Sequence, residues 1–114
     1  MPIIKVWCLP ESTEETLNKL HKSLVSSIVQ IQELNLHDEN DMTMLFPSDM
    51  MKYGLGSEII VEISGLFQRT ERTIDVKQRL AKAVGKTVKT FFPNAKVECL
   101  VYTFDPVLQG FWSS

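Results

Sequence analysis

The feature that most constrains the fold is an order of apolar patterns that occurs twice. Residues 2–46 and 58–104 each hold a β-branched run, a segment with apolar residues at helical spacing, and a second apolar run; an irregular stretch over 48–57 joins them. Valine- and isoleucine-rich runs are typical of strands, whereas recurrence at three, four and seven residues indicates a helix. Because the links from strand to helix are short, each unit predicts two parallel strands joined by a right-handed crossover. The sequence therefore predicts a doubled βαβ unit.

The first unit predicts a strand over residues 2–9 and a short strand over 42–46. Between them, Ser12 and Glu15 have the spacing of a capping box, which marks the start of a helix. We expect this helix to run for about twenty residues, because one apolar stripe continues along it. The residues of the stripe are Leu17, Leu20, Leu24, Val25, Ile28 and Ile31.

The second unit predicts strands over 58–64 and 96–104, separated by a turn over 65–72 and a helix that begins after Thr73. Thr73 suits the N-cap because its hydroxyl can accept a hydrogen bond from an unpaired backbone amide. Gly85 lies inside this helix and weakens it by about 1 kcal/mol relative to alanine. The expected helical face consists of Ile74, Lys77, Leu80, Ala81, Val84, Val88 and Phe91.

The resulting fold class is α+β: a four-stranded mixed sheet with two helices on one face. At 114 residues and 44% apolar composition, the chain is expected to form a single domain over 1–114 with a sizeable core. The other face of the sheet would combine apolar and charged residues, which suits a subunit interface, so we predict an oligomer. The residues expected on that face are Ile3, Lys5, Trp7, Ile60, Glu62, Ser64, Glu98, Leu100 and Tyr102.

Charge and hydropathy exclude several classes of partner. The net charge is −2 and the lysines and arginines are scattered, so no nucleic-acid partner is expected. No apolar run approaches the length of a membrane span, and the amino end lacks the pattern of a secretory signal. These features predict a soluble, cytoplasmic protein without a membrane partner.

The cysteines and histidines predict neither a metal site nor a cofactor. Cys8 and Cys99 fall in strand-like runs far apart in the sequence; one disulfide is possible, but two buried thiols are the favoured interpretation. His21 borders an apolar stripe and His37 lies in an acidic loop, so both are interpreted as structural or solvated. None of these residues has metal-ligand spacing, so no metal ligand is predicted.

Two features nevertheless point to chemistry at one site. If Met1 is removed, Pro2 carries a secondary amine, which can accept a proton or act as a nucleophile. Arg69 and Arg72 directly precede the second helix. Guanidinium groups bind carboxylates through two parallel hydrogen bonds, and the free amides at a helix start also favour anions. The alternative interpretation of the arginines is a solvated surface turn.

The start Met1-Pro2-Ile3-Ile4, the doubled βαβ order and the turn bearing Arg69 and Arg72 resemble the tautomerase superfamily. Its members include 4-oxalocrotonate tautomerase, macrophage migration inhibitory factor, cis-3-chloroacrylic acid dehalogenase and malonate semialdehyde decarboxylase. The arginine pair is similar to that of the dehalogenase and decarboxylase branches. The resemblance implies a homotrimer whose sheets enclose a barrel-like interior, with strand order 2-1-3-4 in each sheet.

The resemblance also implies roles for individual residues. Pro2 would be the general acid and base, Arg69 and Arg72 would bind the carboxylate of a small substrate, and Phe111 or Trp112 would close the pocket. The implied activity is that of a tautomerase or isomerase acting on a 2-keto acid or its enol, without a cofactor. Decarboxylase and hydratase reactions are consistent with the same resemblance.

Departures from the family pattern leave alternatives open. No carboxylic acid follows Asp105, so the water-activating glutamate of the dehalogenase branch has no counterpart, and the aspartate of the decarboxylase could correspond to Asp38 or Asp41. If Met1 is retained, the Pro2 nitrogen is an amide, and the protein would be a non-catalytic oligomeric binding or scaffold module. A ferredoxin-like domain, with strand order 4-1-3-2, is the alternative topology.

Overall fold

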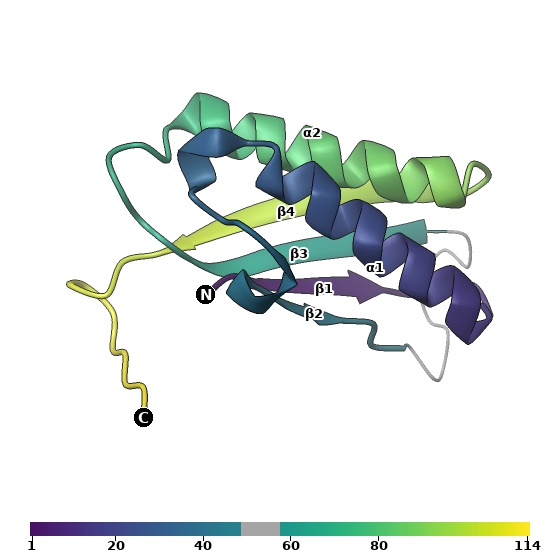
Figure 1. Cartoon of the computed structure of the whole chain (residues 1–114), viewed down its shortest axis with the longest axis horizontal. Helices are drawn as coiled ribbons and strands as arrows, with labels where there is room; N and C mark the ends of the chain where they lie inside the picture. The colour runs from purple at the N-terminus through teal and green to yellow at the C-terminus, as the bar shows by residue number, and fades with distance from the viewer. Residues whose placement is uncertain (49–57) are drawn as a thin grey trace.

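The computed structural model describes residues 1–48 and 58–114. The irregular join predicted over 48–57 therefore lies outside the described residues, except for residue 48. The elements, in chain order (Figure 1), are β1 (Ile3–Trp7), α1 (Glu14–Val29), the short 3₁₀ helices η1 (Gln32–Leu34) and η2 (Glu39–Asp41), β2 (Thr43–Leu45), β3 (Glu58–Phe67), α2 (Ile74–Phe91) and β4 (Lys96–Phe104).

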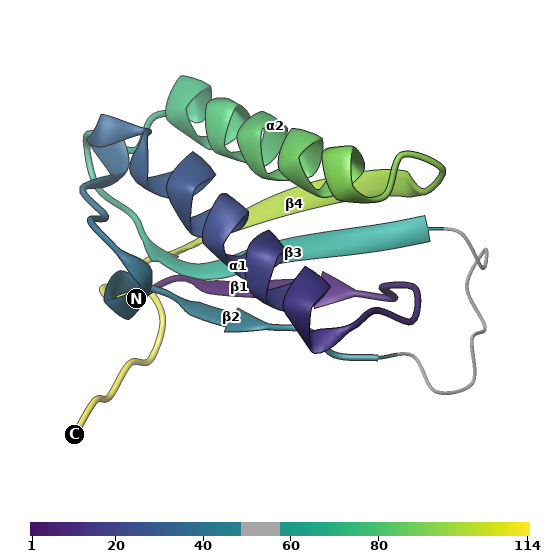
Figure 2. The same cartoon turned by 45° about the vertical axis from the view of Figure 1, so that its right-hand side comes forward.

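The four strands form one mixed sheet in the order β2-β1-β3-β4. Strands β1 and β2 are parallel, as are β3 and β4, whereas β1 and β3 are antiparallel and pair Ile4 with Ile63. Both views show α1 and α2 side by side on one face of the sheet (Figures 1 and 2). The doubled βαβ unit and the order 2-1-3-4 are thus confirmed, and the ferredoxin-like order is wrong for this chain.

The core lies between the helices and the inner face of the sheet. Alternate strand residues point inward, because successive side chains of a strand face opposite sides. The inward residues include Ile4, Val6, Ile59, Val61 and Ile63 from the sheet, Leu20, Leu24 and Ile28 from α1, and Val76, Leu80, Val84 and Val88 from α2. A hydrogen bond of 2.6 Å between the Ser27 and Thr87 hydroxyls also joins the two helices.

Helix α1 differs from its prediction at both ends. Its N-cap is Thr13, whose hydroxyl accepts a hydrogen bond of 3.1 Å from the amide of Thr16. The Ser12 hydroxyl instead donates to the Pro10 carbonyl, so the predicted capping box is not formed. The helix is shorter than expected, because Ile31 leaves the helical conformation even though its side chain is buried.

Helix α2 begins after Thr73 as predicted, with the Thr73 hydroxyl accepting a hydrogen bond of 3.3 Å from the amide of Val76. The predicted apolar face was partly wrong. Ile74 is 75% exposed, and Val76, not Ile74, begins the buried stripe. Two positions apart on a helix correspond to a rotation of about 200°, so the two side chains point in opposite directions.

Strand β3 continues through residues predicted to form a turn. It extends to Phe67, and its register with β4 shifts between Ile63 and Leu66. Such a β-bulge adds one residue to a strand and changes which residues face inward. Gly65, in the bulge, has φ of +69°, and burial resumes at Leu66. A Ser-Gly pair is read as a turn in sequence, which explains the error.

The outer face of the sheet carries the mixed residues that the alternation predicted. Trp7 and Glu62 are joined there by a hydrogen bond of 2.7 Å from the indole Nε1 to the carboxylate Oε1. Leu100 and Tyr102 are exposed on β4. In the chain by itself, this face is therefore uncovered by either helix (Figure 2).

Cys8 and Cys99 are both thiols rather than a disulfide, as predicted, although each is only partly buried. Burial raises the pKa of the Cys99 thiol to about 12.

Across residues 1–48 and 58–114, no helix combines the length and apolarity needed to cross a membrane. The same residues contain no group of three or more His, Cys, Asp or Glu side chains arranged to hold a metal ion.

Candidate active site

A pocket of about 310 Å³ lies where β1 begins and β3 ends. Three parts of the chain line it: Met1 and Pro2 at the amino end; Asn35, Leu36, His37 and Asp41 after α1; and Phe67, Arg69 and Arg72 after the bulge. The antiparallel pairing of β1 with β3 accounts for this proximity, because Ile3 is opposite Ser64. The pocket thus contains three of the residues that the sequence singled out, Pro2, Arg69 and Arg72.

Pro2 is buried at the edge of the pocket, and its carbonyl accepts a hydrogen bond of 2.9 Å from the amide of Thr43. Its nitrogen is bonded to Met1, so it is an amide in this form of the chain. Met1 is 65% exposed, and its Sδ accepts a hydrogen bond of 3.4 Å from the Thr43 hydroxyl.

Gly65 allows the Met1–Pro2 backbone to come this close to β3. A Cβ atom on Gly65 would lie 3.1 Å from the Met1 carbonyl oxygen, and the positive φ of this residue disfavours any L side chain. The bulge therefore serves the geometry of the pocket as well as that of the sheet.

Arg72 is 6% exposed and makes two hydrogen bonds to main-chain carbonyls. Its Nη1 donates to Phe67 at 2.7 Å and its Nη2 donates to Leu34 at 2.8 Å. Burial, and secondarily the charge of Arg69, lower the pKa of Arg72, while Glu71 acts in the opposite direction. Within the described part of the chain, the Arg72 Nε is buried without a hydrogen-bond partner.

Arg69, in contrast, is exposed. No carboxylate among residues 1–48 and 58–114 forms an ion pair with it. It lines the pocket and also a neighbouring hollow of about 480 Å³ at the start of α2, which includes Lys77. Its guanidinium can therefore bind an anion that enters either space.

The segment after α1 brings residues to the pocket that the sequence did not single out as site residues. Asn35 adopts a left-handed conformation (φ 54°), which turns the chain toward the pocket. The carboxylate of Asp41 accepts a hydrogen bond of 2.8 Å from the amide of His37. Of the two aspartates considered in sequence, Asp41 lines the pocket and Asp38 instead caps η2. His37 is exposed, as expected, but it also lines the pocket.

The aromatic residues of the carboxyl-terminal tail differ from each other in position. The Phe111 ring packs edge-on against Phe67, with centroids 5.0 Å apart, and lies 6.1 Å from the ring of Phe104. Because Phe67 lines the pocket, Phe111 supports one of its walls. Trp112 is 84% exposed and lies outside the described lining of the pocket.

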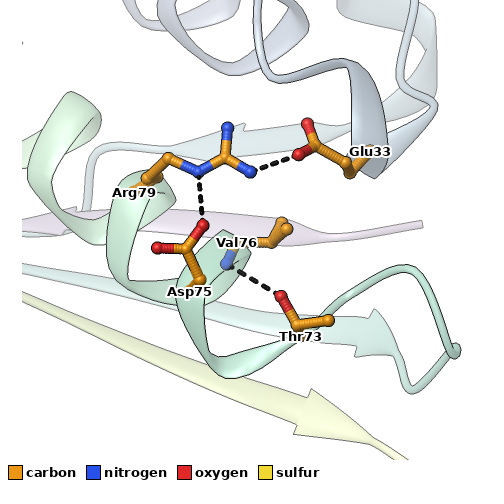
Figure 3. Close-up of polar contacts among 5 residues, drawn as sticks. All are labelled: Glu33, Thr73, Asp75, Val76 and Arg79. Atoms are coloured by element: carbon orange, nitrogen blue, oxygen red, sulfur yellow. Dashed lines mark hydrogen bonds and ion pairs between the residues drawn. The ribbon is translucent and has the colours of Figure 1, made fainter.

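An ion-pair cluster beside the pocket ties η1 to α2 (Figure 3). Arg79 pairs with Glu33 of η1, and its Nε donates to the Asp75 carboxylate at 3.0 Å. The hydrogen bond from Arg79 lowers the pKa of Glu33. This cluster is exposed, and none of its three side chains lines the pocket beside Pro2; it connects η1 to α2.

The strand order and the paired helices define an α+β protein, and this fold is similar to that of solved 4-OT and malonate semialdehyde decarboxylase structures. An asymmetric trimer of a fused 4-OT, designated F6, aligns with a TM-score of 0.77 and 14% identity over 96% of this chain and 91% of that chain. A native fused 4-OT aligns with a TM-score of 0.76 and 13% identity over the same shares. Malonate semialdehyde decarboxylase aligns with a TM-score of 0.65 and 11% identity over 97% of this chain and 91% of that chain.

No protein-family model matches the sequence, and a comparison with curated proteins finds no match. The likeness to the solved structures therefore lies in the fold, which this chain shares along nearly its whole length.

Proposed function

We propose that the protein is a tautomerase-type enzyme that moves a proton on a small 2-keto acid or its enol. The observation that carries the proposal is the pocket in which Pro2 lies with Arg69 and Arg72. The fold shared with a fused 4-OT and with malonate semialdehyde decarboxylase supports it. The proposal requires removal of Met1, which leaves Pro2 as a secondary amine.

The amine would act first as a base and then as an acid. An α-amine ordinarily has a pKa of about 7.7–8.0. Burial and nearby guanidinium charge disfavour the ammonium form, so both lower the pKa of a Pro2 amine toward neutrality. The neutral amine takes a proton from the carbon beside the ketone, and the resulting ammonium returns a proton to another atom of the enolate. The reaction is an isomerisation, so no other reactant is consumed.

Arg69 is proposed to bind the substrate carboxylate, because its guanidinium is exposed at the pocket. Replacing Arg69 with alanine is expected to raise the KM for a carboxylate substrate by about ten- to a hundredfold, the contribution of hydrogen bonds to a charged group. The measurement is steady-state kinetics with a panel of enolised 2-keto acids, including phenylenolpyruvate. Lys77→Ala is the matched control, since Lys77 lines the neighbouring hollow and is absent from the lining of the pocket beside Pro2. An equal rise of KM in the two variants would argue against a specific contact between Arg69 and the substrate carboxylate.

Decarboxylation or hydration is the second candidate reaction. Asp41 favours it, because this carboxylate lines the pocket beside Pro2 and could orient water or a reacting group. Including a 3-oxo acid in the panel and measuring carbon dioxide release distinguishes decarboxylation from isomerisation. Release of carbon dioxide without isomerase activity would replace the first candidate with the second.

The proposed assembly is a homotrimer built through the uncovered face of the sheet. Its mixed apolar and charged residues suit burial against another subunit, and the exposed Trp112 would be available to contact that subunit. The fused 4-OT relative is itself a trimer. Light scattering is expected to give three times the chain mass of 13.0 kDa. A monomer would contradict the assembly and leave Trp112 outside the site.

A non-catalytic oligomeric module is the functional alternative, and the contacts of Met1 favour it. The Met1 side chain accepts a hydrogen bond from Thr43, and its carbonyl packs against Gly65. Intact mass of the untagged protein distinguishes the two functions. Loss of the methionine residue is required for the enzyme, whereas full retention supports the module.

A further inference from the structure

We propose that Arg72 is a positioning residue, which fixes the segment 34–41 against the end of β3 and does not itself contact the substrate carboxylate. This inference rests on the proposed function in one respect: the pocket that Arg72 shapes is taken to be the active site. It differs from the role in substrate binding that the sequence resemblance implies for Arg72.

The hydrogen bonds of Arg72 connect two segments that are far apart in sequence. One terminal nitrogen binds the carbonyl of Phe67, at the end of β3, and the other binds the carbonyl of Leu34, at the end of η1. A planar guanidinium can donate in two directions at once, which a lysine ammonium does less well. Each terminal nitrogen therefore uses one of its N–H groups to hold a main-chain carbonyl, and the Nε, which has no partner in the described part of the chain, is buried.

Arg72 also presents little surface to a ligand. It is 94% buried, whereas Arg69, three residues earlier, is exposed to the same pocket. The two arginines thus have different roles. Arg69 can bind a carboxylate, whereas Arg72 holds the main chain of two segments that line the pocket.

The segment that Arg72 holds carries pocket residues. Leu34 is fully buried, and directly after it come Asn35, His37 and Asp41. The segment then reaches Thr43, whose amide donates to the Pro2 carbonyl. A shift at Leu34 would therefore displace pocket residues and disturb the contact that orients Pro2.

A second arginine provides a control. Arg79 also holds η1, but ties it to the start of α2 through Glu33 and Asp75 (Figure 3) rather than to the end of β3. Its side chain and that of Glu33 are 44% and 43% exposed. Exposed ion pairs contribute little to stability, whereas loss of a buried donor leaves carbonyls without partners. Breaking the two connections should thus have different consequences.

The first measurement is amide hydrogen exchange of the ligand-free protein. In Arg72→Met, exchange at the hydrogen-bonded amides of Leu34, Asn35 and His37 is expected to be about ten- to a hundredfold faster than in the wild type. Arg69→Met and Arg79→Met should leave these amides within about threefold of the wild type. Arg72→Lys keeps the charge and serves if the methionine variant does not fold; it should give an intermediate increase. Unchanged exchange in a folded Arg72 variant overturns the proposal.

The second measurement compares a 2-keto acid with its uncharged methyl ester. A residue that binds the carboxylate matters only for the acid, whereas a positioning residue matters for both. Arg72→Met is expected to lower kcat/KM by similar factors for acid and ester, and Arg69→Met to lower it mainly for the acid. Loss confined to the acid in Arg72→Met would make Arg72 a carboxylate ligand and overturn the proposal. If the wild type acts on none of the substrates, the proposed function fails, while hydrogen exchange still decides the role of Arg72.

Discussion

Replacing Pro2 with alanine, in protein that lacks Met1, is expected to lower kcat/KM for an enolised 2-keto acid by about 100- to 10,000-fold. This is the usual contribution of a positioned general acid or base. An alanine at this position has a primary amine without the ring that holds the nitrogen at the end of β1. Steady-state kinetics with protein of verified intact mass provides the measurement.

Two controls make this result specific to the amino group. Pro10→Ala removes a proline at the opposite end of β1, outside the pocket, and should retain wild-type activity. Protein that retains Met1 should be as inactive as the Pro2 variant, because its Pro2 nitrogen is an amide. Full activity in the Met1-retaining form would exclude Pro2 as the acid–base group.

Gly65→Ala is expected to lower the free energy of unfolding by about 1–2 kcal/mol, the cost of a left-handed conformation for a residue with a Cβ atom. Gly65 has φ of +69° in the bulge of β3. If Met1 is retained, the loss should be greater, because the added Cβ would lie 3.1 Å from the Met1 carbonyl oxygen. Urea unfolding of both forms measures the difference.

Gly85→Ala adds the same atom elsewhere and should have the opposite effect. Gly85 lies within α2 in a helical conformation, and its Cβ would make an ordinary contact of 3.7 Å with the Cβ of Cys99. We therefore expect a gain of about 0.5–1 kcal/mol, the helix propensity of alanine over glycine. Similar changes in the free energy of unfolding of both variants would mean that the left-handed backbone at Gly65 does not cause the loss of stability in Gly65→Ala.

The fold was largely predictable because hydrophobic periodicity reports directly on secondary structure. The alternation in residues 58–64 and the stripe from Leu20 to Ile28 both correspond to buried faces. The errors occurred where one contact decides between local alternatives. Thr13 and Ser12 are both capable N-caps; in the structure Thr13 is the cap, and the Ser12 hydroxyl donates to the Pro10 carbonyl instead.

The site was less predictable, because a sequence does not show what a side chain contacts. The turn containing Arg69 and Arg72 presented two similar cations. Tertiary structure made them different: Arg72 is buried between the carbonyls of Leu34 and Phe67, while Arg69 is exposed. Likewise, the positions of His37 and Asp41 depend on how the segment after α1 folds back toward Pro2.

The sequence by itself determined the doubled βαβ order and a Pro2 nitrogen that becomes basic only without Met1. These properties follow from local periodicity and from the chemistry of single residues. Only the tertiary structure decided the bulge at Gly65, the true face of α2 and the different environments of the two arginines. Each depends on contacts between residues distant in the chain, whose energies are set by packing and burial rather than by neighbours in sequence.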